Sequence, residues 1–203
     1  MSKQPTASKD LSLALDIRPI NVAEYHCMAE AGVFHPEERV ELITGQLVKM
    51  AAKGTAHTVT LRKINRLFTR LSLQLEVMVQ VQDPIVLDNY SEPEPDLALL
   101  RVDPREYIDA HPTAADTYLA IEVADSSFKY DCETKGKLYA QSNIAEYWVV
   151  DVIQRQLHVF RQPSNDGYQS EVILTEDASI SPLQFPQITI YVQEMFAVIR
   201  NQP

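Results

Sequence analysis

The longest periodic pattern in the chain is helical and lies between residues 57 and 76. Apolar residues recur there every three or four positions, which predicts a helix with one buried face. That face consists of Leu61, Ile64, Leu67, Phe68, Leu71 and Leu75. A shorter helix is predicted after Asn21, because Glu24 stands at the capping-box position and Gly32 follows the expected end.

Short apolar runs bounded by proline, glycine or charged residues predict the strands. Residues 39–43 and 46–50 flank Thr44-Gly45 and are typical of a hairpin. Further strands are expected at residues 77–81, 97–100, 118–124, 147–151, 156–160, 168–174 and 188–190. A third helix is expected from about Tyr130 to Gln141, and a helical turn near Met195. This order predicts an α/β fold, with one mixed β-sheet flanked by α-helices.

Length and charge limit the classes of protein that fit the sequence. The 203 residues suffice for one domain with a substantial core, which we expect over residues 20–203, after a flexible N-terminal arm over residues 1–19. The net charge of -10 argues against broad, non-specific binding to nucleic acid, but leaves room for a local basic groove. No apolar run approaches a membrane span or a signal-peptide core, so we expect a cytoplasmic protein without a membrane segment.

The sequence favours a metal site built from carboxylates rather than from cysteines. Cys27 and Cys132 lie far apart, and no Cys/His spacing typical of a zinc site or a disulfide framework is present. Asp96 and Glu122, by contrast, each belong to a run that is predicted to be a buried strand. A carboxylate there is costly unless a cation or hydrogen-bond donors compensate it. Two of them can supply the oxygen ligands of a divalent ion that assists phosphodiester cleavage.

A lysine on the helix after Glu122 can complete such a site. Asp131, Lys135 and Tyr139 fall at positions i, i+4 and i+8, so an α-helix places them on one face. Lys137 is turned away from that face. We therefore favour Lys135 as the group that orients the attacking water or stabilises the transition state. The alternative, that Lys135 is an ordinary solvated lysine, stays open at this point.

Five stretches of the chain, in order, resemble the Uma-two family of restriction endonucleases. The stretches are Glu38-Arg39-Val40-Glu41-Leu42-Ile43-Thr44-Gly45, Glu92-Pro93-Glu94-Pro95-Asp96, Glu122-Val123-Ala124-Asp125-Ser126-Ser127, Asp131 through Lys135 to Tyr139-Ala140, and Glu146-Tyr147-Trp148-Val149-Val150-Asp151. The resemblance covers roughly residues 20 to 197. The order of Asp96 and Glu122 is also similar to the PD-(D/E)xK core of the wider superfamily. One position departs from that core, because Ala124 stands where its lysine is expected.

The resemblance implies a restriction-endonuclease-like fold and a metal-dependent endonuclease that hydrolyses DNA. On this expectation Asp96, Glu122 and the carbonyl of Val123 hold Mg²⁺ or Mn²⁺, and Lys135 replaces the missing strand lysine. Glu41 maps onto the acidic residue that the superfamily contributes from its first element. His57 also matches a family position, at the start of a helix that faces nucleic acid. Double-strand cleavage by such a core usually needs two active sites, so a homodimer is expected.

Several of these residues also have an ordinary structural interpretation. Glu41 can pair with Arg39 or Lys49 on a hairpin face, and His57 can be a hydrogen-bonding residue at a helix start. A row of arginines at four-residue spacing is either an exposed helix face or a surface that binds phosphates; it consists of Arg62, Arg66 and Arg70. The chain can also be a catalytically silent nucleic-acid-binding or accessory protein that retains the nuclease fold. The sequence gives neither a recognition site nor a preference between DNA and RNA.

Overall fold

The computed structural model describes residues 18–35 and 37–197 of the chain. The arm expected over residues 1–19 therefore lies, except for its last two residues, outside the described residues. The helical elements are α1 (Val22–Glu30), α2 (Thr55–Ser72), the 3₁₀ turn η1 (Ala114–Asp116), α3 (Phe128–Tyr130), the π turn η2 (Asp131–Lys135), α4 (Gly136–Gln141) and the 3₁₀ turn η3 (Val192–Met195). The strands are β1 (Val40–Ile43), β2 (Gln46–Lys49), β3 (Met78–Gln80), β4 (Leu97–Leu100), β5 (Thr117–Ala124), β6 (Glu146–Asp151), β7 (Gln156–Ser164), β8 (Gly167–Leu174), β9 (Ser179–Ile180) and β10 (Ile190–Tyr191).

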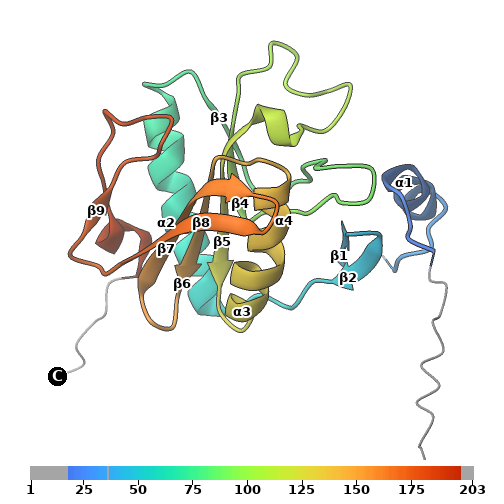
Figure 1. Cartoon of the computed structure of the whole chain (residues 1–203), viewed down its shortest axis with the longest axis horizontal. Coiled ribbons are helices and arrows are strands. Elements are labelled where there is room, and N and C mark those ends of the chain that lie inside the picture. The colour runs from blue at the N-terminus through green and yellow to red at the C-terminus, as the bar shows by residue number, and fades with distance from the viewer. Residues whose placement is uncertain (1–17, 36, 198–203) are drawn as a thin grey trace, which may run out of the picture.

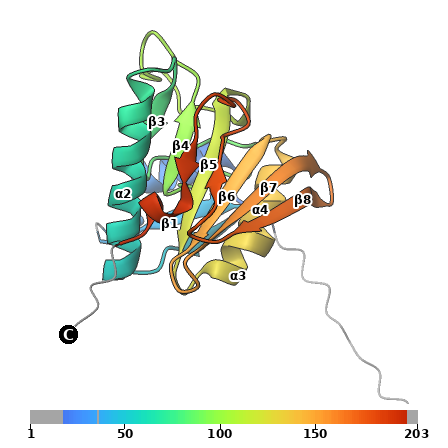
Figure 2. The ribbon, with the colours of Figure 1, turned by 90° about the vertical axis from the view of Figure 1, so that its left-hand side faces the viewer.

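Six strands form one mixed sheet at the centre of the protein (Figure 1). Their order is β3-β4-β5-β6-β7-β8, and all neighbours are antiparallel except β5 and β6. A parallel pair needs a long crossover, which α3, η2 and α4 provide here. Figure 2 shows α2 on one face of the sheet and α3 and α4 on the other. The predicted α/β fold, with a mixed sheet flanked by helices, is confirmed.

The side chains of β5 alternate between two cores, one on each face of the sheet. Leu119 and Ile121 belong to the larger core, which α2 covers. Ala120 and Ala124 point the other way, into the smaller core under α4. Glu122 shares their side of the strand. The strand period therefore aims this carboxylate at the crossover helices rather than at α2.

Helix α2 buries the face that its period predicts. The buried residues of this helix are His57, Thr60, Leu61, Ile64, Leu67 and Phe68. It ends at Ser72 rather than near Glu76, because the chain tightens into i→i+3 bonds beyond Leu71. None of the helices in residues 18–35 and 37–197 combines the length and apolar character that crossing a membrane requires.

The hairpin is not part of the main sheet, contrary to the prediction of a single sheet. Strands β1 and β2 form a two-stranded sheet of their own, and β9 and β10 form another. The hairpin turn has φ of 48° at Thr44 and 77° at Gly45, as a type I′ turn requires. An isolated bridge between Leu42 and Glu92 joins the hairpin to the segment before β4. Local alternation predicts a hairpin, but which sheet it joins depends on contacts between distant segments.

The third helix also differs from the prediction. It begins at Phe128, two residues earlier than expected, and its second segment is the π turn Asp131–Lys135 instead of a regular α-helix. Such turns are rare and occur frequently at functional sites. The turn carries both Asp131 and Lys135, and both side chains are buried.

Candidate active site

Strand pairing places Asp96 and Glu122 side by side. Leu97 of β4 pairs with Ile121 of β5, and one step beyond this pair the antiparallel register sets Asp96 opposite Glu122. The backbone N–H of Asp96 donates to Glu122 Oε2 at 3.4 Å. Asp96 is 7% exposed and Glu122 is 4% exposed. Two carboxylates buried this close together need cations or donors around them.

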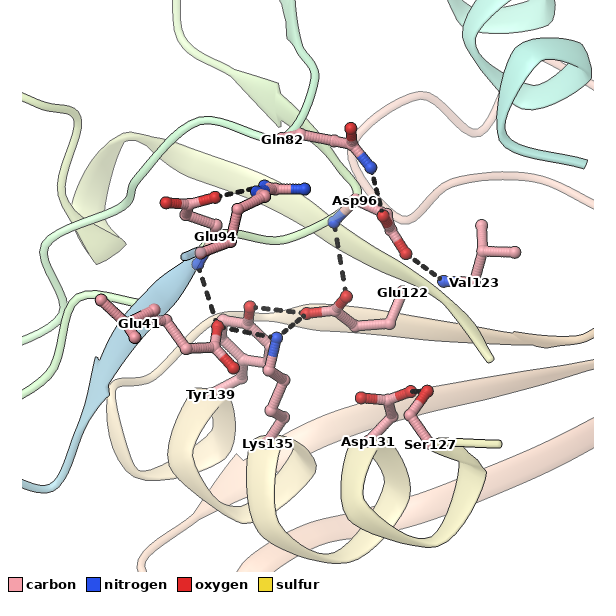
Figure 3. Close-up of polar contacts among 12 residues, drawn as sticks. Glu41, Gln82, Glu94, Asp96, Glu122, Val123, Ser127, Asp131, Lys135 and Tyr139 are labelled. Carbon is pink, nitrogen blue, oxygen red and sulfur yellow. Dashed lines mark hydrogen bonds and ion pairs between the residues drawn. The ribbon is translucent and has the colours of Figure 1, made fainter. Parts of the chain in front are cut away.

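Asp96 is held as a carboxylate by three hydrogen-bond donors. Nε2 of His57 lies 2.8 Å from Oδ2, and the backbone N–H of Val123 donates to the same oxygen at 3.0 Å. The side-chain amide of Gln82 donates to Oδ1 at 2.7 Å (Figure 3). Burial raises the pKa of Asp96, but the hydrogen bond and charge of His57 and the other donors outweigh burial and lower it. Asp96 is therefore ionised. Donors from three elements, α2, β5 and the loop after β3, fix the orientation of its carboxylate.

The ammonium group of Lys135 lies between two carboxylates (Figure 3). Its Nζ is 2.9 Å from Glu122 Oε1 and 2.9 Å from Glu41 Oε2. The hydroxyl of Tyr139 donates to the same oxygen of Glu122 at 3.1 Å. Burial lowers the pKa of Lys135, but Glu122 and Glu41 outweigh burial, so the pKa is raised and the lysine keeps its charge. Burial raises the pKa of Glu122, and the nearby carboxylates Asp131, Asp96 and Glu41 add to this rise, against the lowering effect of Lys135.

Asp131 adds a further buried carboxylate at the π turn. It is 4% exposed, and its Oδ2 accepts a hydrogen bond from Ser127 Oγ at 2.6 Å. Burial raises the pKa of Asp131 to about 6, against the opposing effects of the Ser127 hydroxyl and of Lys135. In the metal-free protein this carboxyl group therefore carries a proton across the mildly acidic range.

We expect Asp131→Asn to stabilise the metal-free protein at about pH 8 but not at about pH 4. The pKa of Asp131 is raised from 3.8 to about 6, so folding favours the protonated carboxyl group, and this contribution is lost as the pH rises through 6. The free energy of unfolding lost in this way is at most about 3 kcal/mol, because the pKa differs by about two between the folded and unfolded states. Asparagine retains an acceptor for Ser127 and has no charge to bury.

The measurement is urea unfolding in EDTA at both pH values. Glu133→Gln is the matched control, because Glu133 lies on the same turn but is exposed, and it should change stability little at either pH. An Asp131→Asn effect of equal size at both pH values would exclude Asp131 as the source of the pH dependence.

The site residues predicted from the sequence open onto one pocket of about 330 Å³. Six of them line it, namely Glu41, His57, Asp96, Glu122, Val123 and Lys135. The arginine row is not in this lining. Its side chains are exposed on α2, and the row runs from near the pocket towards η3, where Arg70 lies 3.9 Å from Glu194. The residues predicted to bind metal or to act in catalysis thus lie together in one pocket, and the arginine row lies outside it.

Three residues that line this pocket have a buried polar atom without a hydrogen-bond partner in the described part of the chain. These atoms are Nζ of Lys53, Nδ1 of His57 and the hydroxyl of Tyr130. Lys53 Nζ lies 3.8 Å from Asp96 Oδ1, beyond hydrogen-bond range, and burial lowers the pKa of Lys53. Burial raises the pKa of Tyr130 to about 12. Buried polar atoms normally have partners, so three that converge on one pocket indicate a site for a polar ligand.

Lys53, Gln82 and Tyr130 were not predicted as site residues from the sequence. Lys53 and Gln82 lie in segments without helix or strand periodicity, and Gln82 has a φ of 58°, which no spacing rule anticipates. Tyr130 stands at the start of a helix whose π turn was not predicted. For Val123 the structure shows a bond from the backbone N–H to Asp96, whereas the proposed ligand atom is the carbonyl oxygen.

The pocket has the composition of a site for a hard divalent cation. Its lining contains six carboxylates but only three lysines. Mg²⁺ prefers oxygen ligands and commonly takes only one or two carboxylates, with water completing its shell. Asp96 and Glu122 are the adjacent pair that can provide them. Burial and, to a smaller extent, neighbouring carboxylates raise the pKa of Glu122, and a bound cation would compensate both effects.

Comparison with known proteins identifies relatives of this chain. Residues 22–193 match the sequence profile of the Uma2 (Uma-two) family, described as "Putative restriction endonuclease". The fold is similar to the crystal structure of "a putative nuclease belonging to DUF820" from Anabaena variabilis ATCC 29413. That comparison has a TM-score of 0.70 at 14% sequence identity, and covers 88% of this chain and 98% of the other. No match was found among the curated proteins.

Proposed function

The chain belongs to the Uma2 family, and from that membership we propose that it is a metal-dependent nuclease that hydrolyses phosphodiester bonds of DNA. One observation supports this more than any other. The pocket joins a carboxylate pair, a buried lysine and three buried polar atoms that have no partner in the described residues. A phosphate ester that reacts with water needs this combination of acceptors for a cation and donors for anionic oxygens.

In the proposed site Asp96, Glu122 and the carbonyl of Val123 would hold Mg²⁺ or Mn²⁺. Such an ion, when bound, neutralises charge on the phosphate and lowers the pKa of the attacking water. The donors around Asp96 fix its orientation before any ion arrives. The two strands hold both carboxylates in place through their backbone pairing, which leaves little rearrangement for catalysis.

The remaining residues would act on water and phosphate. Lys135, fixed between Glu41 and Glu122, presents a permanent positive charge beside the carboxylate pair. Nε2 of His57 lies 2.8 Å from Oδ2 of the ionised Asp96, and Nδ1 has no hydrogen-bond partner among the described residues, so Nδ1 would be left to bond a water or a substrate oxygen. Nζ of Lys53 and the hydroxyl of Tyr130 are donors suited to phosphate oxygens.

The arginine row on α2 would extend the contact with nucleic acid beyond the pocket. We expect replacement of Arg62, Arg66 and Arg70 by glutamine to weaken DNA binding and to flatten its salt dependence. Each lost phosphate contact should reduce the slope of log K against log salt by about 0.9. Fluorescence anisotropy of a labelled duplex in EDTA measures this slope. The control is Arg105→Gln, because Arg105 is an exposed arginine that lies on a loop away from α2. An unchanged slope would identify the row as a solvated helix face.

We further propose that residues 20–203 form one catalytic domain and that two copies assemble as a homodimer. Each chain has one carboxylate pair in its pocket, and one such site cuts one strand at a time. A closed two-fold dimer would present two sites to the two antiparallel strands of a duplex. Sedimentation of the protein with and without DNA tests the assembly, and a monomer under both conditions would contradict it.

The test of the function is a nicking assay on supercoiled plasmid with Mg²⁺, with Mn²⁺ and with EDTA. We expect conversion to open-circular or linear DNA with either ion and none in EDTA. Single-stranded DNA and RNA substrates of equal length measure the substrate preference. If the protein binds DNA but cuts none of these substrates with either ion, the non-cleaving accessory role replaces the nuclease.

A further inference from the structure

A second cluster of ionisable side chains lies outside the active-site pocket, between α1 and two loops. Its members are His26 on α1, Glu92 in the segment before β4, and His111 in the connection between β4 and η1. One ligand atom of each lies within 4.8 Å of the others. None of the three lines the pocket that holds Asp96 and Glu122.

Glu92 is the buried member of the cluster and is poorly provided with donors. Its side chain is 2% exposed, and Nε2 of His26 lies 2.9 Å from each of its two oxygens. One N–H cannot saturate a carboxylate, which offers about four acceptor sites. The neighbouring ring of His111 is exposed and stands edge-on to His26, with ring centroids 6.1 Å apart. A buried anion thus meets two imidazoles at the protein surface.

We propose that His26, Glu92 and His111 bind a Zn²⁺ ion that is separate from the nuclease metal. Two imidazole nitrogens and one carboxylate oxygen are a ligand set that Zn²⁺ takes in proteins, with water in the fourth position. A hard ion such as Mg²⁺ prefers oxygen ligands and belongs in the other pocket. The ion would take the place of the direct contact between His26 and Glu92, with a ring nitrogen of the exposed His111 as its third protein ligand.

Zinc at this position would join three segments that also support the active site. The backbone N–H of Glu92 donates to the carbonyl oxygen of Leu42 in the hairpin at 2.7 Å. Two residues further on, the N–H of Glu94 donates to Glu41 Oε2 at 3.2 Å. The ion would therefore fix α1 and the loop of His111 to the segment that leads into Asp96. Its effect in this proposal is to hold these segments together, and the nuclease chemistry does not need it.

The experiment measures Zn²⁺ binding to tag-free protein in the Asp96→Asn background, which weakens the nuclease metal site. Calorimetry with Zn²⁺ gives the affinity and stoichiometry, and Co²⁺ absorption between about 500 and 650 nm reports a tetrahedral site with nitrogen ligands. We expect one Zn²⁺ per chain. His111→Gln should weaken binding by more than roughly 100-fold, because even the loss of an outer partner costs about 10–100-fold.

His35→Gln is the matched control, since His35 is also exposed but lies outside the cluster, and it should bind Zn²⁺ as the parent does. His111→Gln removes an exposed side chain and should fold normally, which thermal unfolding without metal checks. Absence of Zn²⁺ binding in the parent would show that His26 and Glu92 form only an ion pair. Equal binding by the parent and by His111→Gln would place the ion elsewhere, and either result overturns the proposal.

Discussion

Asp96→Asn is expected to reduce Mg²⁺-dependent plasmid nicking by at least about 100-fold, because a metal ligand accounts for several kcal/mol of transition-state stabilisation. It should also remove the thermal stabilisation that millimolar Mg²⁺ gives the wild type. In the metal-free protein it should lower stability, since the donors around Asp96 favour its ionised form. An asparagine amide would set its NH₂ group against one of these two donors, the side-chain amide of Gln82 or Nε2 of His57.

Asp151→Asn provides the matched control for this substitution. Asp151 is as buried as Asp96, at 5% exposed, and also accepts backbone N–H bonds, but it lies outside the pocket. It should nick plasmid at the wild-type rate and gain the same stability from Mg²⁺. An Asp96→Asn protein that responds to Mg²⁺ as the wild type does would exclude Asp96 as a metal ligand.

Lys135→Met should separate metal binding from turnover. The ammonium is not a ligand, and its loss leaves Glu41 and Glu122 without their cation, so Mg²⁺ affinity should rise. Turnover should fall by about 100-fold or more, because the positive charge beside the reacting phosphate is gone. Without metal, the unpaired buried carboxylates should cost about 3–5 kcal/mol of stability, less what protonation of Glu122 recovers.

Lys137→Met tests whether the position of the lysine matters or only its presence on the helix. Lys137 is exposed two residues further along, so the variant should match the wild type in stability, Mg²⁺ affinity and nicking. Calorimetry with Mg²⁺ and single-turnover nicking at saturating Mg²⁺ give the two quantities separately. Weaker Mg²⁺ binding in Lys135→Met, or equal losses of turnover in both variants, would contradict the role assigned to Lys135.

The sequence predicted those parts of the site that depend on periodicity or on a family motif. The strand period of β5 already put Glu122 on one face of a buried strand. The motif order led to Asp96, Glu41 and Lys135, and the structure brings all four into one pocket. Their catalytic and metal-binding roles remain predictions, because proximity alone does not establish chemistry.

The residues that the sequence did not reveal come from long-range geometry. Lys53 and Tyr130 reach the pocket from a loop and from a helix start, and neither position has a local signature. His26 and Glu92 are 66 residues apart, so no Cys/His spacing rule could connect them. The helix period did predict that the arginines share an exposed face. It could not predict which end of that helix meets the pocket, because that depends on how α2 packs on the sheet.

The π turn makes the geometry of the pocket depend more on the number of residues in the turn than on the side chain at position 134. Thr134 is exposed within the turn, so its substitution by serine or alanine should matter little. Deleting it would be different, because one residue fewer rotates what precedes it by about 100° relative to α4. Asp131 precedes the deleted position, whereas Lys135 and Tyr139, which both bond to Oε1 of Glu122, follow it, so the deletion would turn Asp131 away from them. Relatives that keep this geometry should therefore tolerate exchanges at Thr134 but no insertions or deletions between Asp131 and Lys135.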